Sequence, residues 1–408
     1  MLERELITLS GERRLTMLRH EISSCLSIRF LNAREVRRGG IKLKRTRNIV
    51  VLLTILALVM SCCLAGCSKE KTSETVTPTE PAVRTIVDDA QREHTIPTEI
   101  TKVFSTSPVG TILLYTLDPE LLIGWNYELR EGEKEYILPE LHSLPNLGGW
   151  YAKATCNTEE LLKIHPDIII SVGVIDDMAV SQADEIQQQT GIPVIQINGE
   201  LAKFDKTYEF AGKLLNREEK AQELADYCKK AISDAQNKSK TINPEKRLKV
   251  YYAEGAAGLE TDPRMSRHTE VLEMVGGVNV AEVSMKGGMG MTPVSLEQVL
   301  SWNPDVIISW NRTQGGYFDK IMTDPKWEGI AAVQNKKVYA VPSGPFNWFD
   351  RPPSANRILG IKWLGNLLYP DVYKYDMAKE TKEFYKKFYH YDLTDEELTS
   401  LLKDAGGK

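Results

Sequence analysis

The chain of 408 residues is short of the residue patterns that mark enzymes and metal centres. It contains no Gly-x-Ser-x-Gly elbow, and its glycine-rich segments lack the Gly-Lys-Ser/Thr of a phosphate-binding loop. Its histidines are scattered, with no pair four residues apart, and its six cysteines form no Cys-x-x-Cys. We therefore predict a protein that is not an enzyme, needs no cofactor and carries no resident metal ion.

Positive charge is scarce outside the N-terminal region. Residues 67–408 hold 39 Lys and Arg against 51 Asp and Glu, a net charge of −12. Nucleic-acid binding depends on many Lys and Arg contacts to phosphate, so this balance argues against a nucleic-acid partner. An anionic ligand would have to be held by arginines placed locally around it.

The apolar run near the N-terminus is short for a helix that crosses a membrane. The run Ile49 to Met60 is short of the roughly 20 residues that cross a bilayer. Basic residues precede it and small residues follow it, which is the order of a secretory signal. The sequence Leu64 to Cys67 resembles a bacterial lipobox, in which the cysteine is lipidated and becomes the mature N-terminus. We predict a signal region over 1–66 and a lipid anchor at Cys67, on the outer face of the cytoplasmic membrane, at a cell surface or in a periplasm.

Two shorter segments flank this signal. Residues 1–40 precede a normal basic region and show no core pattern, so we interpret them as an over-extended gene start. Residues 67–83 are mostly Ser, Thr, Glu, Lys and Pro, a composition typical of a flexible tether. Cys156 and Cys228 are the cysteines beyond it; we expect two buried thiols, with a disulfide between them as the open alternative.

A fifteen-residue phrase occurs twice, at 157–171 and 295–309, 138 residues apart. Two copies are too few for a solenoid and favour two similar lobes. The stretch 204–238 lies between them, with apolar residues at helical spacing from Ala221 to Ala235 and charged residues on the other face. Seven positions of the phrase are identical: Glu159/Glu297, Leu162/Leu300, Pro166/Pro304, Asp167/Asp305, Ile169/Ile307, Ile170/Ile308 and Ser171/Ser309.

Apolar strands alternate with helices on both sides of this stretch, which predicts parallel sheets. Strand 167–172 and helix 177–189 lie before it; strand 248–253, strand 305–310 and helix 318–333 lie after it. We predict an α/β fold of two lobes with mainly parallel sheets. The predicted lobes are 84–203 and 239–408, the latter with closing helices, and one long helix over 204–238 joins them.

Several phrases together resemble the substrate-binding lipoproteins of ABC importers, in the iron-complex and cobalamin branch. They are DDAQREHTIP, EELLKIHPDIII, EVLEMVGGVNVAE, VSLEQVLSWNPDVII and NWFDRPPS, and the resemblance covers about residues 84–403. It implies two α/β lobes joined by a long helix, with a ligand cleft between them. One departure is Gln91, where such proteins usually have glycine in the opening turn.

The resemblance also gives the repeated glutamates a role. In proteins of this kind one exposed glutamate on each lobe docks into an arginine pocket of the permease, and the matching positions are Glu159 and Glu297. A carboxylate on each lobe suits such charge-assisted contacts. The alternative is that both are solvated residues of a first helical turn, favoured by the helix dipole.

The ligand is expected at the carboxyl ends of the strands, between the lobes. Aromatic side chains there would suit a flat chelate, and arginines would suit carboxylate, catecholate or oxyanion groups. For each residue an ordinary core or surface role is the alternative, and Arg351 could pair with Asp350. The candidates are Trp150, Tyr151, Arg264, Arg267, Trp310, Arg312, Trp348 and Arg351.

These features predict a monomeric solute-binding lipoprotein that passes a small metal complex to an ABC permease and its ATPase subunits. A ferric siderophore is the first ligand expected. Cobalamin, haem, and molybdate or tungstate are alternatives within the same class, and an exported lipid-anchored hydrolase is the alternative from another class.

Overall fold

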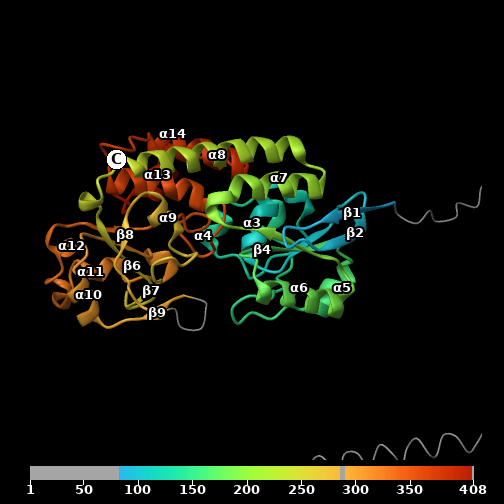
Figure 1. Ribbon diagram of the computed structural model, residues 1–408, viewed down its shortest axis with the longest axis horizontal. Coiled ribbons are helices and arrows are strands. Elements are labelled where there is room, and N and C mark those ends of the chain that lie inside the picture. The colour runs from blue at the N-terminus through green and yellow to red at the C-terminus, as the bar shows by residue number, and fades with distance from the viewer. Residues whose placement is uncertain (1–81, 285–289, 407–408) are drawn as a thin grey trace, which may run out of the picture. The chain divides into compact units, whose positions relative to one another are not determined.

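The computed structural model describes residues 82–284 and 290–406 (Figure 1). The predicted signal region, the lipidation site at Cys67 and all but the end of the tether lie outside these residues. Within them, no helix is both long and apolar enough to cross a membrane.

The first lobe is built on a three-stranded parallel sheet in the order β3-β4-β5. A β1–β2 hairpin precedes it, and its turn is tied to β5 because Asp89 binds the backbone N–H of Asn198 at 2.7 Å. The strands are β1 Val83–Val87, β2 Glu93–Pro97, β3 Val103–Ser105, β4 Ile168–Gly173 and β5 Val194–Asn198; the main helices are α3 Pro108–Leu117, α5 Thr158–Ile164 and α6 Asp177–Thr190.

The second lobe has a four-stranded parallel sheet in the order β11-β10-β6-β8, with a small β7–β9 ladder beside it. The predicted helix over 318–333 is wrong, because Pro325 begins a 3-10 turn that separates two four-residue helices. The strands are β6 Lys249–Ala253, β7 Glu260–Thr261, β8 Val278–Asn279, β9 Thr292–Pro293, β10 Val306–Ser309 and β11 Val338–Ala340; the helices are α9 Glu270–Met274, α10 Leu296–Trp302, α11 Phe318–Ile321, α12 Ala331–Gln334 and α13 Asn356–Leu368.

The stretch between the lobes is two helices rather than one, α7 Phe204–Leu215 and α8 Glu218–Lys240. The chain turns at Asn216, whose φ of 54° is one that asparagine tolerates better than most residues. Gly212 lets the two helices meet closely, because a Cβ there would lie 2.4 Å from the Cβ of Ala221. The linking helix is therefore α8, whose 23 residues extend about 35 Å.

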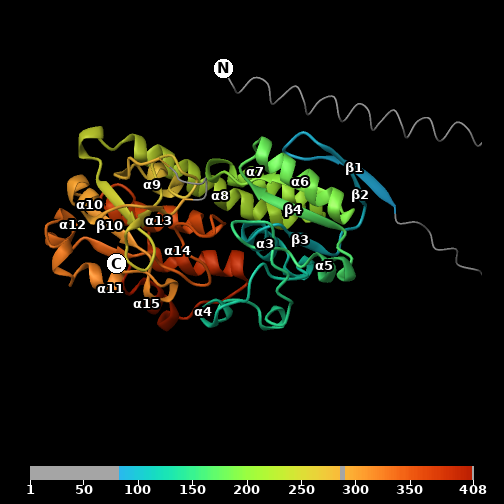
Figure 2. The same cartoon turned by 90° about the horizontal axis from the view of Figure 1, so that it is seen from below.

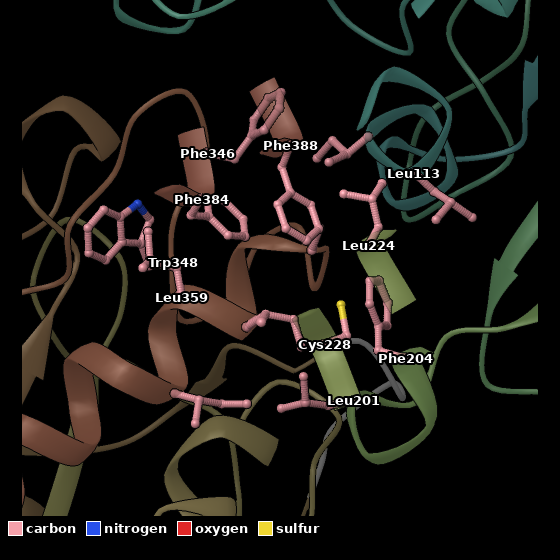
Figure 3. Close-up of a cluster of buried hydrophobic side chains, with 14 of the residues drawn as sticks. Leu113, Leu201, Phe204, Leu224, Cys228, Phe346, Trp348, Leu359, Phe384 and Phe388 are labelled. Carbon is pink, nitrogen blue, oxygen red and sulfur yellow. The ribbon is translucent and has the colours of Figure 1, made fainter. Parts of the chain in front are cut away.

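Both lobes share one hydrophobic core along α8. The buried residues of α8 run from Ala221 to Ala235 at the predicted spacing. The C-terminal helices α14 Met377–Phe384 and α15 Asp395–Leu402 follow α13, and the turn after α14 returns to the first lobe, where the rings of Tyr115 and Tyr389 are 5.9 Å apart. In the view of Figure 3, Leu224 of α8 lies between Phe388 and Leu113 of α3 in this core. Figure 2 shows α9 to α13 on one side and α3, α5 and α6 on the other.

The two cysteines of this body lie in separate clusters. Cys228 is fully buried in the shared core and Cys156 in a smaller cluster beneath β4 and α5. Both are free thiols, so the disulfide alternative is not realised.

Candidate functional site

Three of the seven identities of the repeated phrase, an aspartate and two isoleucines, have a structural cause. Asp167 accepts hydrogen bonds from the backbone N–H groups of Thr101 and Lys102, at 2.7 and 2.9 Å. Asp305 does the same for Lys249 at 2.8 Å in the other lobe. Each aspartate therefore fixes the start of the strand beside its own, and the isoleucines that follow it are fully buried.

Two of the repeated positions have no such cause within the described residues. Glu159 and Glu297 lie in the first turns of α5 and α10, exposed and without an ion pair. One helical turn further on, Leu162 and Leu300 are 37% and 36% exposed. An exposed carboxylate next to an exposed leucine is thus presented at equivalent places on both lobes.

The second lobe carries a buried charge cluster at the carboxyl end of β6. Arg351 donates to Glu254 and to Asp262, both at 2.5 Å, and lies 3.4 Å from Asp350. The three carboxylates are fully buried, whereas the Arg351 side chain is 20% exposed. Its backbone has a φ of 52°, a conformation that costs free energy and that the ion pairs hold in place. The cluster therefore presents one edge of a guanidinium to solvent in a fixed orientation.

Three carboxylates around one guanidinium give this cluster an excess of negative charge, which favours protonation of a carboxyl group. Burial raises the pKa of Glu254 well above 4.5; Arg351 opposes this shift, and the neighbouring Asp262 adds to it. Oε1 of Glu254 accepts from Arg351, while Oε2 is buried without a donor. A proton on Oε2 would turn that atom into a donor toward Asp262 and satisfy both groups.

Asp262, His268 and Asp350 could offer three metal-ligand atoms, all within 4.8 Å of one another. Most of their ligand atoms are already engaged, although Oδ2 of Asp350 has no hydrogen-bond donor among the described residues. His268 Nδ1 is 2.7 Å from Asp350, and Asp262 accepts from Arg351 and, at 3.3 Å, from Ser266. A cation in this place would also meet the positive charge of Arg351, so the group fits a charge network better than a metal site.

Arg267 reaches from the second lobe to the first. It is exposed, and its Nη1 lies 3.9 Å from where a Cβ would sit on Gly173, at the carboxyl end of β4. Arg264, three residues earlier, is also exposed. Neither arginine has a carboxylate at ion-pair distance among the described residues. Arg267 does donate from Nε to Nε2 of His268 at 3.4 Å. The structure thus places two exposed arginines on the loop after Asp262, one of them against the opposite lobe.

The first lobe offers a polar rim at the carboxyl end of β3. Trp150 and Tyr151 are half-buried there, held by bonds from Trp150 N–H to Thr106 and from Tyr151 Oη to Asn126, at 2.8 and 3.1 Å. The N-terminus of α3 begins beside Thr106, and the side chain of its N-cap, Ser107, makes no capping bond. These groups can face a bound solute without losing internal bonds.

Three further predicted residues lie differently. Trp310 is half-buried at the end of β10, where its Nε1 donates to Tyr252 at 2.7 Å. Arg312 is 80% exposed and makes a two-pronged ion pair with Asp319. Trp348 is fully buried in the shared core beside Phe384 (Figure 3), so it forms no part of a solvent-facing wall.

Sequence reasoning missed Glu254, Asp262 and His268. The predicted pairing of Arg351 with Asp350 exists but is its longest ion pair. A signal for the others was present, since Glu254 directly follows a buried strand and Asp262 and His268 flank the two predicted arginines. Nothing in their spacing indicated that three loops would meet.

Comparison with known proteins places the chain among binding proteins. The family model described as "Periplasmic binding protein" matches residues 143–345. The molybdate-binding protein MolA of Haemophilus influenzae is 27% identical over 76% of this chain and 91% of its own length. The Fe(3+)-citrate-binding protein YfmC of Bacillus subtilis is 23% identical over 71% and 88%. The structure of an ABC transporter solute binding protein from Sulfurospirillum deleyianum has a TM-score of 0.73 and 32% identity over 78% of this chain and 99% of that one.

Proposed function

We propose that this chain captures a compact anionic metal species outside the membrane and delivers it to a permease. The chain belongs to the periplasmic binding protein family of ABC-transporter substrate-binding proteins, which is the starting point for this proposal. Proteins of this family bind solutes and are not enzymes, so the hydrolase alternative is set aside. The proposed body comprises lobes 84–203 and 239–408, anchored through Cys67.

The observation that carries this proposal is the position of Arg267. Its guanidinium lies 3.9 Å from the Cβ position of Gly173 in the other lobe, so the gap between the lobes is narrow at this point. Arg264 and Arg267 follow Asp262 in the chain, and Arg351 pairs with Asp262, so three guanidinium groups come from neighbouring segments of the second lobe. Guanidinium donors match oxyanions in charge and geometry.

A tetrahedral oxyanion such as molybdate or tungstate fits this arrangement best, and a relative with 27% identity is named for molybdate binding. A ferric carboxylate chelate is the second candidate, because the half-buried Trp150 and Trp310 could border a larger ligand and another relative is named for ferric citrate. Ferric siderophores of other kinds follow. Cobalamin and haem come last, because Arg267, which reaches the opposite lobe, would have to move aside for ligands of their size.

A binding experiment decides among these ligands. The purified chain is titrated by calorimetry with molybdate, tungstate, sulfate, ferric citrate, a ferric catecholate, cobalamin and haem. We expect molybdate and tungstate to bind at one site and to raise the melting temperature. Tight binding of cobalamin or haem, with no response to any anion, would overturn the proposal.

Replacement of Arg267 tests the site itself. Arg267→Ala should weaken molybdate binding at least about tenfold, the loss expected when a charge-assisted contact is removed. Arg312→Ala is the matched control, since Arg312 is equally exposed but pairs with Asp319 on the surface. Equal affinities of the two variants would place the ligand elsewhere.

The permease is proposed to contact Glu159 and Glu297. Both are exposed, equivalent in the two lobes and without an ion pair among the described residues, so their charges are available to arginines of another protein. Glu159→Lys with Glu297→Lys should abolish uptake in cells while ligand affinity is unchanged. Glu160→Lys is the control, because Glu160 lies beside Glu159 but pairs with Lys163 at 3.0 Å. Normal uptake by the double variant would refute the docking role.

A further inference from the structure

One buried ion pair of the second lobe holds the backbone of the first. Arg357, in the first turn of α13, is 1% exposed and pairs with Glu270 at the start of α9. Its Nη2 donates to the carbonyl oxygen of Gly199 at 2.9 Å. Gly199 follows β5 of the first lobe, so a single guanidinium bonds to both lobes.

Glu270 makes a second contact of the same kind. While one carboxylate oxygen accepts from Arg357, the other accepts from the backbone N–H of Leu201 at 3.4 Å. The pair therefore meets a carbonyl and an N–H only two residues apart on the first lobe. We call Arg357, Glu270 and their bonds to residues 199–201 the interlobe strut.

The strut connects to both walls at the narrow point of the cleft. In the first lobe, Gly199 N–H donates to the carbonyl of Gly173 at 2.8 Å, and Gly173 is the residue that Arg267 approaches. In the second lobe, Arg267 lies on the loop that runs directly into Glu270. That loop is fastened by Glu273, which accepts from the N–H of Met265 at 2.6 Å.

We propose that Arg357 and Glu270 are positioning residues that set the spacing between Arg267 and Gly173, and thereby the affinity for a small anion. They touch no ligand. Arginine suits this task because its planar fork donates in fixed directions to two partners at once, which a lysine ammonium does not reproduce. The part that concerns affinity rests on the proposed function, whereas the part that concerns spacing does not.

The helix α13 supplies a matched control. Lys362 is also buried, also on α13, and pairs with Glu380 of α14 and with Tyr227 of α8, at 2.8 Å to the latter. In the described part of the chain, this pair makes no hydrogen bond to residues 199–201. Glu270→Gln and Glu380→Gln therefore remove the same charge from a buried pair on the same helix, but only the first change loosens the strut.

Hydrogen–deuterium exchange of the full chain measures the effect without a ligand. In Glu270→Gln the amides of residues 198–203 and 171–175 should exchange about tenfold faster than in Glu380→Gln, the factor expected for loss of a hydrogen bond to a charged group. Molybdate affinity should fall by a similar factor in Glu270→Gln alone. Arg357→Lys keeps the charge but should show the same faster exchange at residues 198–203 and 171–175 and the same loss of molybdate affinity. It replaces Glu270→Gln in the experiment if that variant folds poorly.

The two readouts separate the two hypotheses. Equal exchange of residues 198–203 in the Glu270→Gln, Arg357→Lys and Glu380→Gln variants would overturn the strut. Faster exchange in the first two, with no molybdate binding by the unaltered chain, would keep the strut and reject the oxyanion. Faster exchange with unchanged molybdate affinity would show that the spacing does not control binding.

Discussion

At the scale of single residues, Gln91 shows a local cost in a turn that is otherwise well bonded. It closes the β1–β2 hairpin with a φ of 62°, and its N–H donates to Asp88 at 2.9 Å. The left-handed conformation costs a non-glycine residue about 1–2 kcal/mol. Glycine removes this strain, but it also increases the conformational entropy of the unfolded chain, which offsets part of the gain in stability. Gln91→Gly should raise the free energy of unfolding by about 0.5–1 kcal/mol in urea titrations. Gln91→Ala is the control and should give no gain, because alanine meets the same strain.

A second prediction at this scale concerns Glu254 and the dependence of the free energy of unfolding on pH. Its folded-state pKa lies well above the usual 4.5, so the folded chain keeps a proton that the unfolded chain loses as the pH rises. The stability that this group contributes is complete below pH 4.5 and declines above it, until the folded carboxyl also ionises. Glu254→Gln imitates the protonated form and removes this decline.

The measurement is the difference in free energy of unfolding between Glu254→Gln and the unaltered chain at pH 5 and pH 8. We expect the variant to gain about 1 kcal/mol or more relative to the unaltered chain between these values, since one pKa unit corresponds to 1.36 kcal/mol. Glu282→Gln, an exposed change near the cluster, should give parallel curves. A loss of stability in Glu254→Gln at pH 8 would mean that the ionised pair with Arg351 is the favoured state.

At the scale of elements, α5 and α10 combine charge with apolar surface. Leu162 and Leu300 lie three residues after the two glutamates, so they share a helix face with them, and each is more than a third exposed. If the glutamates dock, the leucines would be covered in the same contact. Leu162→Ser with Leu300→Ser should lower uptake severalfold while ligand affinity and melting temperature change little, because the side chains bury less than a core leucine. Leu161→Ser, a fully buried neighbour, should instead destabilise the fold.

Elements with a strong period were predictable from sequence, and short or irregular ones were not. The buried face of α8 matches the predicted positions from Ala221 to Ala235, because one apolar stripe determines how a long helix packs. The turn at Asn216 was missed, since charged residues on both sides continue a helical composition. The predicted helix at 318–333 failed because Pro325 and short-range capping by Asp324 outweigh its apolar residues.

Some residues of the candidate site could likewise be predicted from the sequence, and others could not. Arg264, Arg267 and Arg351 could be proposed because cations on loops after strands are unusual in so acidic a chain. The partners of Arg351 could not, because Glu254, Asp262 and Asp350 come from three separate loops that only the folded sheet brings together. Trp348 was a candidate by residue type, yet its burial depends on how α13 and the C-terminal helices close over it.

At the scale of the whole molecule, two packed segments join the lobes in addition to the interlobe strut. The helix α8 is one, and the segment after α14 is the other. There the ring of Phe388 lies 5.9 Å from that of Tyr208, and the Tyr115 hydroxyl donates to the carbonyl oxygen of Tyr389 at 3.2 Å. A single cluster of buried side chains contains residues of α3, α8, α9 and α13 (Figure 3). The lobes therefore share a core as well as a connecting helix.

This shared core predicts that the lobes unfold together. Calorimetry should give one transition with equal calorimetric and van't Hoff enthalpies, although the chain is long enough for two domains. Phe388→Ala should lower the stability of the whole unit by about 3–5 kcal/mol, because it leaves a cavity where the lobes meet. Val299→Ala, which lies in a cluster of the second lobe alone, is the control for an ordinary core cavity. Two resolved transitions, of which Phe388→Ala shifted only one, would show that α8 links lobes that fold independently.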